Sequence, residues 1–463
     1  MNCEELLFSL QTLSRSRDKQ AFSCLTKRFH PSDLVEALGE LSDEQNLSLL
    51  MLLDPHTRAE LFAHYPDERQ DALLRAMPRQ TIVQLFEQMP SDDRANLFNR
   101  LTSDDRQKIL PALARVERED ILRMAAFPEG SVGAETTSDY ASVTEEMTVG
   151  QALAHVRATA PAKETIYVIY VLDKHSKLRG TVSLRDLVLA DEQTNIAHIM
   201  HSEPVYCRTS QPREHASELI RHYDLLALPV INEEGKMTGI VTVDDAMDIE
   251  KEQDASQLAR FGGTSTLAGG VDLDVLHSPL RHMFKIRLFW LAILTVFGIV
   301  TSTFVAAQEE MLSQVIVLAA FIAPIVDMGG NTGSQSATLV IRAMALGELK
   351  LKWRDVGFII KRELPVVAAL GIVIAILETV LAYFSKGVGT DVLLVVGLSM
   401  LICTALGGII GALLPFIARF IGTDPATLSS PLITSIMDLL GVLIYFSLAY
   451  AFLGDMLLQT GQG

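Results

Sequence analysis

Five long apolar segments in the second half of the chain constrain its fold more than any other feature. They cover residues 283–307, 311–345, 363–384, 391–418 and 428–453, and each has the ~20 residues that a helix needs to cross the hydrocarbon core of a bilayer. In lipid, backbone hydrogen bonds have to close within the segment, which favours helices. The sequence therefore predicts a polytopic α-helical membrane domain with five transmembrane helices over residues 281–463.

Basic residues are divided unevenly between the ends of these segments. The first and third connections hold only Lys386, whereas ten basic residues flank the other ends: Arg281, Lys285, Arg287, Arg342, Lys350, Lys352, Arg354, Lys361, Arg362 and Arg419. Because Lys and Arg collect on the cytoplasmic side, we expect the N-terminus inside and the C-terminus outside. The chain is then a multi-pass protein of the cytoplasmic (inner) membrane.

Residues 30–113 repeat every twelve residues, in seven units without a gap, from HPSDLVEALGEL to TSDDRQKILPAL. Positions eight, nine and twelve of nearly every unit are apolar, which places them on one face of a short helix. Most units open with Pro, Ser or Asp, as helix N-termini prefer. One such helix cannot bury its face alone, so stacked repeats are expected. We predict an all-α, superhelical N-domain over residues 1–129.

An α/β sequence is repeated between this N-domain and the membrane domain. Residues 167–186 align without gaps on residues 226–245, and each copy is predicted to form a strand, a polar turn, a second strand and a helix. The pair resembles tandem CBS domains, which we place at 130–192 and 193–255, with a linking helix over 256–280. In CBS domains the Ser/Thr-x-x-Asp motif contacts ATP or another adenine nucleotide, which implies Ser183 with Asp186 and Thr242 with Asp245 as ligands. The alternative is that both motifs only cap helices.

Charge separates the soluble half from the membrane half. The formal net charge is −17, and residues 1–270 hold 28 of the 39 basic and 43 of the 56 acidic side chains. Such a surface repels nucleic acid and attracts multivalent cations. The four cysteines are scattered without metal or disulfide spacing. We therefore expect no nucleic-acid partner and an affinity for cations.

Asp438 is a carboxylate in the middle of the fifth apolar segment. Thr434 lies four residues earlier on the same helix face, with the small residue Gly441 near by. A charge at this depth is presumed functional, and magnesium is bound through few carboxylates because it dehydrates reluctantly. We interpret Asp438 and Thr434 as an ion site; a buried hydrogen bond between helices or a proton relay is the alternative.

The second apolar segment carries polar residues and glycines that lipid would not tolerate on its surface. Gly330, with Gly329 and Gly333, allows close helix approach or a helix break that exposes carbonyl oxygens. Asn331 opens a polar stripe that continues to residue 336, and Asp327 precedes it. This stripe predicts a cavity or a partner helix; small-residue packing with hydroxyls bonded to their own helix is the alternative.

A dense run of acidic residues ends the second α/β copy. The run holds six carboxylates, and the helical repeats add two acidic pairs: Asp244, Asp245, Asp248, Glu250, Glu252 and Asp254, with Asp92 and Asp93 and with Asp104 and Asp105. Such a run repels itself unless counterions bind, although a solvated face is the alternative.

The motifs GGNTGSQS, IRAMALGEL and DPATLSSPLITSIMDLLGVLIYF resemble the MgtE family of magnesium channels, and the resemblance covers nearly the whole chain. It implies Mg²⁺ uptake, not enzymatic activity, by a homodimer joined through its membrane and CBS domains. The pore would be lined by the second and fifth helices, with Asp438 as the selecting carboxylate and Asn331 and Thr434 beside it. The resemblance also implies that acidic residues of the cytosolic domains share Mg²⁺ ions that close the channel: Asp92, Asp93, Asp244, Asp248, Glu250, Glu252 and Asp254.

Three other functions are weighed against a channel. A coupled carrier would use Asp438 and Glu378 as relays, but five spans divide poorly into inverted repeats. If the chain were a membrane-anchored sensor without conduction, neither the polar stripe of the second segment nor the mid-bilayer carboxylate would have a function. An enzyme lacks support, because the chain has no P-loop, no G-x-S-x-G and no H-E-x-x-H motif. Conduction of a divalent cation is the function that these sequence features favour.

Overall fold

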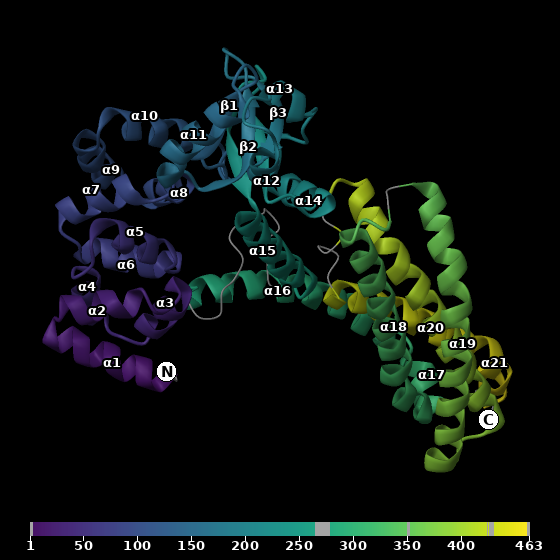
Figure 1. Cartoon of the computed structure of the whole chain (residues 1–463). Coiled ribbons are helices and arrows are strands. Elements are labelled where there is room, and N and C mark those ends of the chain that lie inside the picture. The colour runs from purple at the N-terminus through teal and green to yellow at the C-terminus, as the bar shows by residue number, and fades with distance from the viewer. Residues whose placement is uncertain (1–2, 264–277, 350–351, 424, 426–429, 461–463) are drawn as a thin grey trace. The chain divides into compact units, whose positions relative to one another are not determined.

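The computed structural model describes residues 3–263, 278–349, 352–423, 425 and 430–460. They divide into two compact units, Met1–Lys251 and Glu252–Gly463. The first unit holds short helices and two small sheets, and the second is built from long helices (Figure 1).

The N-terminal part of the first unit is a stack of short helices. Two helices precede the repeats, each repeat contains one helix, and a last helix closes the stack. They are α1 (Cys3–Ser16), α2 (Lys19–Thr26), α3 (Pro31–Gly39), α4 (Asp43–Leu50), α5 (Pro55–Ala63), α6 (Asp67–Ala76), α7 (Arg79–Gln88), α8 (Ser91–Arg100), α9 (Ser103–Ile109) and α10 (Arg115–Met124). From α3 to α9 each helix begins twelve residues after the last. The predicted helical N-domain is therefore confirmed.

Local chemistry explains why each repeat starts a helix where it does. Side chains of Ser42, Asp54 and Thr102 accept a hydrogen bond from the backbone N–H three residues later, which satisfies an otherwise unpaired donor of the first turn. The apolar positions of the repeats face inward, and Phe62 and Phe86 are fully buried in one continuous core.

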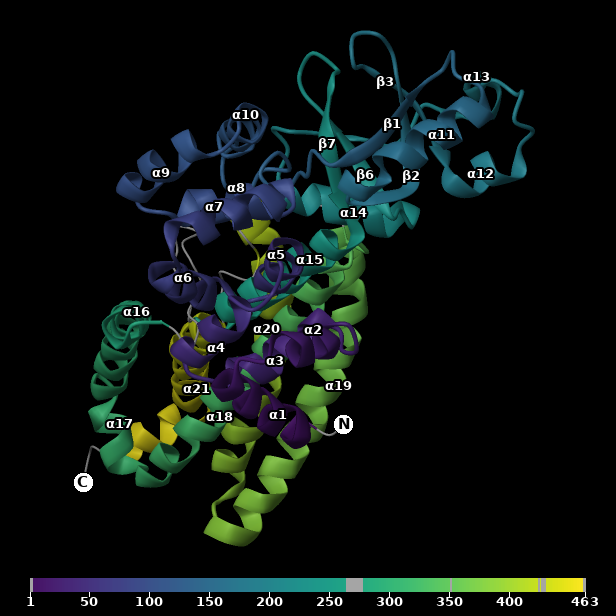
Figure 2. The same ribbon diagram turned by 60° about the vertical axis from the view of Figure 1, so that its left-hand side comes forward.

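Two small mixed sheets follow. The first has the order β1 (Tyr140–Thr144), β2 (Thr165–Leu172), β3 (Leu178–Ser183) and β4 (His201–Ser202), with β1 and β2 parallel and the rest antiparallel. Helices α11 (Val149–Thr159), α12 (Leu184–Leu189) and α13 (Ile196–Ile199) belong to it. The second sheet has the order β5 (Cys207–Arg208), β6 (Ala227–Ile231) and β7 (Met237–Thr242), with α14 (Arg213–Tyr223) and α15 (Val243–Phe261). Figure 2 shows the two sheets next to each other.

The segment before the first sheet packs on the second sheet. Val132 lies in the core of the second copy, together with Cys207 and Val230. Thr137 exchanges two backbone hydrogen bonds with Ile240 of β7, of 2.8 and 2.9 Å. The chain thus reaches the second copy before it forms the first, and the two copies make one interlocked α/β pair.

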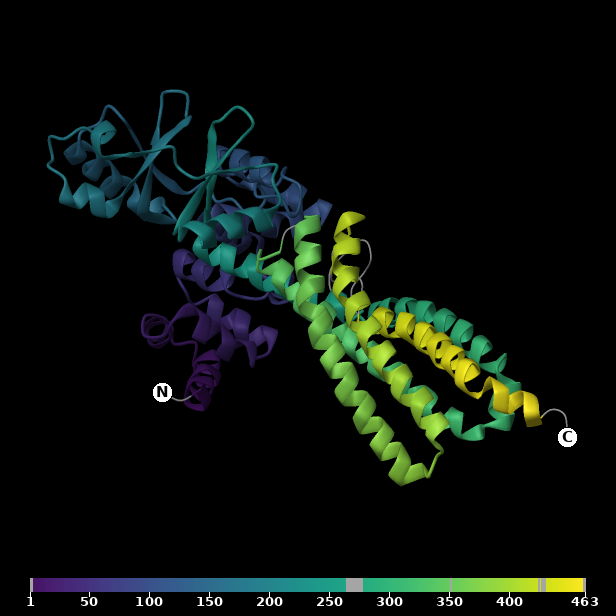
Figure 3. The same cartoon turned by 90° about the vertical axis from the view of Figure 1, so that its right-hand side faces the viewer.

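The second unit holds the membrane helices. Among the described residues, five helices are long and apolar enough to cross a bilayer. Figure 3 shows them side by side, and their bounds are α16 (Leu280–Ala306), α18 (Ala319–Ala345), α19 (Trp353–Lys386), α20 (Thr390–Phe420) and α21 (Ser430–Thr460). Helix α18 packs against α20 and α21, α19 packs against α20, and α16 packs against α21.

Some predicted boundaries differ from the observed ones. The second span was expected from residue 311, but the short helices α17 (Glu309–Gln314) and η3 (Ile316–Leu318) come first. The third helix begins at Trp353 rather than at 363. The apolar pattern missed its first turns because they contain charged residues. Of the predicted linking helix over 256–280, α15 covers the part up to Phe261, and residues 264–277 lie outside the described chain.

Candidate functional site

The contact between α18 and α21 brings two predicted ion-site carboxylates together. Asp327 on α18 and Asp438 on α21 lie close enough to interact electrostatically. Asn331 donates a hydrogen bond of 3.0 Å from Nδ2 to Oδ2 of Asp327. Three side chains that the sequence singled out in two distant segments thus form one polar group at the level of the spans.

Glycines on α18 permit this close contact. A Cβ at Gly330 would lie 3.0 Å from Cγ2 and 3.2 Å from Cα of Thr434 on α21, and a Cβ at Gly333 would lie 2.9 Å from the carbonyl oxygen of Gly407 on α20. Helix α18 is continuous from Ala319 to Ala345. Of the two roles expected for these glycines, close helix approach is therefore observed and a helix break is not.

The hydroxyls of this region are divided between their own helices and their neighbours. Thr332 donates to the carbonyl of Met328 at 2.8 Å within α18, as the alternative interpretation of the polar stripe expected. Thr434 likewise donates to the carbonyl of Ser430 at 3.0 Å within α21. Ser334 and Ser430 share a hydrogen bond of 2.9 Å between α18 and α21. Ser336 donates to Oε1 of Glu363 on α19 at 2.5 Å. Glu363, which the sequence did not single out, thus joins α19 to the pore-candidate helix.

A polar stripe on α18 stays exposed at the surface of the single chain. Asp327, Asn331, Gln335 and Thr338 are exposed, at spacings of four, four and three residues, whereas Thr332 between them is buried. Residues at these spacings share one helix face. Lipid does not solvate a carboxylate and an amide at span depth. This face therefore requires water or another polypeptide.

A second acidic group lies in the first unit, where α8 meets the α/β pair. The hydroxyl of Ser91, the first residue of α8, accepts a 2.6 Å hydrogen bond from the Ser138 N–H and shares one of 3.0 Å with the Thr137 hydroxyl. Ser91 is fully buried. These bonds hold the start of α8 against the α/β pair, so that Asp92 and Asp93 face Asp244 and Asp245 of α15.

We call the group of Asp92, Asp93, Glu164, Asp244 and Asp245 the acidic junction. Burial, then the charges of Asp93, Asp245 and Glu164, raise the pKa of Asp92 well above its usual value. Burial is also the first cause that raises the pKa of Asp93 to about 6 and of Asp245 to about 7, with Asp244 adding repulsion to both. Oδ1 of Asp92 is buried without a hydrogen-bond partner. The junction therefore carries negative charge that favours a cation or a proton.

The junction matches part of the acidic set expected from the sequence. It contains Asp92, Asp93 and Asp244, and adds Glu164, for which the sequence held no signal. Among the described residues, no three His, Cys, Asp or Glu side chains lie close enough to hold one metal ion directly.

The remaining expected ligands lie further along α15. Asp248 and Asp254 are exposed, and Glu250 forms an ion pair of 3.0 Å with Arg221 on α14. Glu252 lies between Glu250 and Asp254 on the same helix. These four carboxylates are therefore not brought into the acidic junction.

The two Ser/Thr-x-x-Asp motifs cap helices in the structure. Ser183 donates to Oδ2 of Asp186 at 2.6 Å, and Thr242 donates to Oδ2 of Asp245 at 2.5 Å. Their environments differ, since the Ser183 hydrogen bond lowers the pKa of Asp186, whereas burial raises that of Asp245. Asp186 thus remains open to a ligand, while Asp245 belongs to the acidic junction.

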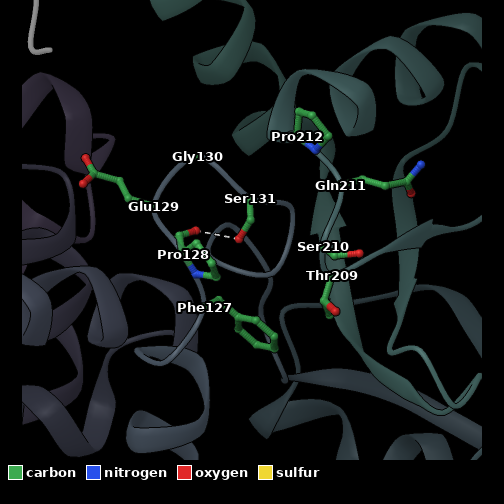
Figure 4. A pocket seen from close by; sticks show the side chains of 9 residues that line it. All are labelled: Phe127, Pro128, Glu129, Gly130, Ser131, Thr209, Ser210, Gln211 and Pro212. Atoms are coloured by element: carbon green, nitrogen blue, oxygen red, sulfur yellow. Dashed lines mark hydrogen bonds between the residues drawn. The ribbon is translucent and has the colours of Figure 1, made fainter. Parts of the chain in front are cut away.

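A pocket of about 390 Å³ lies elsewhere in the first unit, between residues 127–131 and 209–212. The Ser131 hydroxyl donates to the Pro128 carbonyl there, and the Glu129 carboxylate points away (Figure 4). None of the nucleotide-ligand candidates lines it. We assign it no role in the site.

Comparison with known protein families identifies three kinds of domain along the chain. Residues 322–448 match the profile described as a divalent cation transporter, MgtE. Residues 29–130 match the MgtE intracellular N domain, and residues 132–192 and 196–252 match CBS domains.

Similar proteins cover the whole length of the chain. A magnesium transporter MgtE from Thermus thermophilus is 35% identical over 96% of this chain and 98% of its own length, and one from Bacillus subtilis is 29% identical over 98% of both. Among solved structures, the cytosolic domain of the Mg²⁺ channel MgtE in complex with ATP is 35% identical, with a TM-score of 0.50 over 52% of this chain and 99% of that one. The soluble part of a magnesium transporter is 27% identical, with a TM-score of 0.52 over 54% of this chain and 99% of that one.

Proposed function

The chain belongs to the MgtE family of divalent cation transporters, and on that premise we propose that it is a magnesium-selective channel. It takes up Mg²⁺ across the cytoplasmic membrane and closes when Mg²⁺ binds its acidic cytosolic domains. The family is one of transporters, so the chain is a membrane protein for magnesium transport and not an enzyme.

The observation that carries the channel proposal is the proximity of the Asp438 and Asp327 carboxylates across the α18–α21 contact. Two carboxylates and the amide of Asn331 attract a hard, strongly hydrated cation. Thr434 and Gly330 keep α18 and α21 in contact at this level. We propose that Mg²⁺ binds here with most of its water, through Asp438 first.

The exposed stripe of Asp327, Asn331, Gln335 and Thr338 supports a homodimer. In a single chain this stripe would face lipid, where an ionised carboxylate costs several kcal/mol. A twofold pair of chains would turn the two stripes toward a shared aqueous pore lined by α18 and α21. We propose that the dimer also contacts through the CBS domains.

The basic residues support an inward N-terminus. The end of the bundle where α16 and α19 begin and α18 and α20 end carries all the described basic residues of the spanning region except Lys386. By the positive-inside rule that end faces the cytoplasm, which puts the acidic first unit inside and the C-terminus outside.

The acidic junction supports closure by Mg²⁺. At low Mg²⁺ its carboxylates repel one another and favour separation of α8 from α15; at high Mg²⁺ the cation offsets this repulsion. Because no described group of three carboxylates can hold an ion directly, we propose hydrated Mg²⁺ between Asp92, Asp93 and Asp244. Asp248, Glu250, Glu252 and Asp254 of α15 would add ligands as the assembly compacts.

The first CBS copy supports a nucleotide site. Asp186 keeps its charge and is partly exposed next to Ser183, as a ribose acceptor requires. The related cytosolic domain solved with ATP makes ATP the ligand we propose, at Ser183 and Asp186. Thr242 and Asp245 would be available only when α8 leaves the acidic junction.

Uptake of Mg²⁺ into proteoliposomes tests the pore. The intact protein is expected to conduct, and Asp438→Ala and Asp438→Asn to lose most of the flux or the selectivity while remaining folded. Glu378→Gln, which removes a carboxylate from α19 instead, is the matched control and should conduct like the parent. If both Asp438 variants conduct normally, the selecting carboxylate lies elsewhere, with Asp327 next; if the intact protein carries no Mg²⁺, the channel proposal is wrong.

Deletion of residues 1–255 tests the gate separately. The remaining helices are expected to conduct but no longer to close at high Mg²⁺, because the acidic junction is gone. A truncated protein that still closes at the same Mg²⁺ concentration, or that conducts nothing, would contradict the gating model.

A further inference from the structure

A group of basic side chains surrounds an aromatic stack at one end of the membrane helices. Trp353 at the start of α19 stacks on Phe420 at the end of α20, with ring centroids 5.2 Å apart and planes 29° apart. This contact places the neighbours of Trp353 in sequence beside the neighbour of Phe420. We call the four exposed cations at this corner the basic patch: Lys352, Arg354, Arg362 and Arg419.

The corner is held by an apolar cluster beneath the patch. Val356 of α19 packs with Phe416 of α20 and with Met344 at the end of α18. Arg362 lies over the ring of Phe358, 5.7 Å from its centroid. The patch therefore sits on packed helix ends, which fixes the spacing of its charges.

The cations of the patch lack carboxylate partners. In the part of the chain that the structure describes, none of the four forms an ion pair. Arginines of the helical N-domain behave differently, since Arg69, Arg94 and Arg100 all pair with aspartates. Asp355 and Glu363 are neighbours of the patch in sequence, and the Glu363 carboxylate accepts a hydrogen bond from Ser336 on α18. The patch is thus a surface that favours an anion.

Apolar surface continues from the patch along the spans. Trp353 is 78% exposed and Phe358 52%, and Ile417 one turn before the end of α20 is 47% exposed. Aromatic residues of this kind mark the level of the lipid headgroups. A ligand that satisfies this corner is anionic at one end and apolar at the other.

We propose that the basic patch is a binding surface for an anionic glycerophospholipid of the cytoplasmic leaflet. The phosphate contacts Arg354 and Arg419, and the acyl chains lie along Phe358 and Ile417. The leaflet follows from the orientation proposed above. The positive-inside rule alone explains why basic residues lie at this end, but not why these four form no ion pair or why three of them flank the exposed Trp353–Phe420 stack in sequence.

The lipid has a mechanical role in this position. It bridges the start of α19 and the end of α20, and α20 packs on α18 through the glycines of both helices. An anionic lipid therefore supports the helix that lines the candidate pore, at the end where the ion leaves.

Native mass spectrometry of the full chain tests the proposal, because it counts retained lipids without requiring conduction. The protein is released from nanodiscs of phosphatidylcholine with phosphatidylglycerol, which expose both leaflets. The parent is expected to retain phosphatidylglycerol over phosphatidylcholine. Arg354→Gln with Arg419→Gln should weaken this retention by about fivefold per charge, or roughly 30-fold for the pair.

Two matched variants make the outcome specific. Arg281→Gln with Arg287→Gln removes two charges at the same end, but on α16, which packs on α21, and should retain the lipid within about twofold. Arg354→Lys with Arg419→Lys keeps both charges and should bind within about threefold of the parent.

The proposal is overturned if the parent retains both lipids equally, or if the α16 pair loses as much as the glutamine pair. It is also overturned if the lysine pair binds as weakly as the glutamine pair. Displacement of the lipid by soluble glycerol phosphate at millimolar concentration would identify a phosphate site instead of a lipid surface, and would equally refute it.

Discussion

Lowering the pH from about 8 to about 6 without divalent cations is expected to stabilise the cytosolic unit, because its acidic junction takes up protons. A carboxyl with a raised folded-state pKa adds stability that is fully present below its unfolded-state pKa, 3.8 for these aspartates, and is lost as the pH rises through the folded-state value. Asp245 titrates at about 7 and Asp93 at about 6. The window of the effect is therefore pH 6–7.

A lower bound on the size of the effect follows from these two groups. Each proton bound only in the folded state changes the free energy of unfolding by about 1.36 kcal/mol per pH unit. Between about pH 8 and about pH 6 Asp245 takes up nearly a whole proton and Asp93 about half of one, which together contribute about 2 kcal/mol. Asp92, whose pKa is raised well above its usual value, adds to this in the same direction. For a unit of this size, about 2 kcal/mol alone corresponds to a rise of about 4–8 °C in the transition temperature.

Calorimetry of the full chain in EDTA measures this shift. Fluorescence would miss it, because both tryptophans, Trp290 and Trp353, lie in the membrane half. Asp245→Asn should remove the contribution of this group, about 1.4 kcal/mol between about pH 8 and about pH 6. Glu36→Gln, which neutralises an exposed carboxylate of α3, should leave it unchanged. A transition temperature that falls toward pH 6 would refute the reasoning, as would a full slope in Asp245→Asn.

Two further substitutions test the packing that positions the sites. Ser91→Ala leaves the Ser138 N–H without its 2.6 Å partner and should cost about 1–3 kcal/mol; we expect the channel to need more Mg²⁺ to close, as measured by uptake at graded internal Mg²⁺, and an unchanged closing concentration would contradict this. Gly411→Ala places a Cβ 2.0 Å from the carbonyl oxygen of Gly333 and should cost at least about 1–3 kcal/mol. Gly298→Ala, which meets nothing within 4 Å, is its control, and equal thermal stability of the two variants would show that α18 and α20 are not packed this closely.

Sequence periodicity predicted the N-domain well because helix starts are local chemistry. A Pro, Ser or Asp every twelve residues caps or begins a helix whatever surrounds it, and the observed starts at Pro31, Asp43 and Pro55 follow that period. The spans were placed less closely. An apolar count reports only the part within hydrocarbon, so it missed the polar first turns of α19 and the break at Val315, where the backbone leaves helical geometry.

The sites show the limit of such reasoning more clearly. A charge in an apolar segment is visible in the sequence, so Asp438 and Asp327 could be proposed as site residues, and the structure places them close enough to interact electrostatically. The acidic junction depends on contacts between segments far apart in the chain. Charge density proposed Asp92, Asp93 and Asp244, but nothing local distinguishes Glu164 from a solvated residue before a strand, or pairs Glu250 with Arg221.

The interlocked α/β pair also determines which hydrogen-bonded contacts would transmit a displacement of the N-domain to α15. Ser91 is hydrogen-bonded to Thr137 and Ser138, and Thr137 is joined to Ile240 of β7 by two backbone hydrogen bonds. Helix α15 begins directly after β7. A Cβ at Gly239 would lie 2.2 Å from the Thr137 carbonyl oxygen, so glycine at this position is what lets the Thr137 segment lie this close to β7. This route runs through the second copy. A change of ligand in the first copy would leave this connection between α8 and α15 in place, whereas a change in the second copy would alter it.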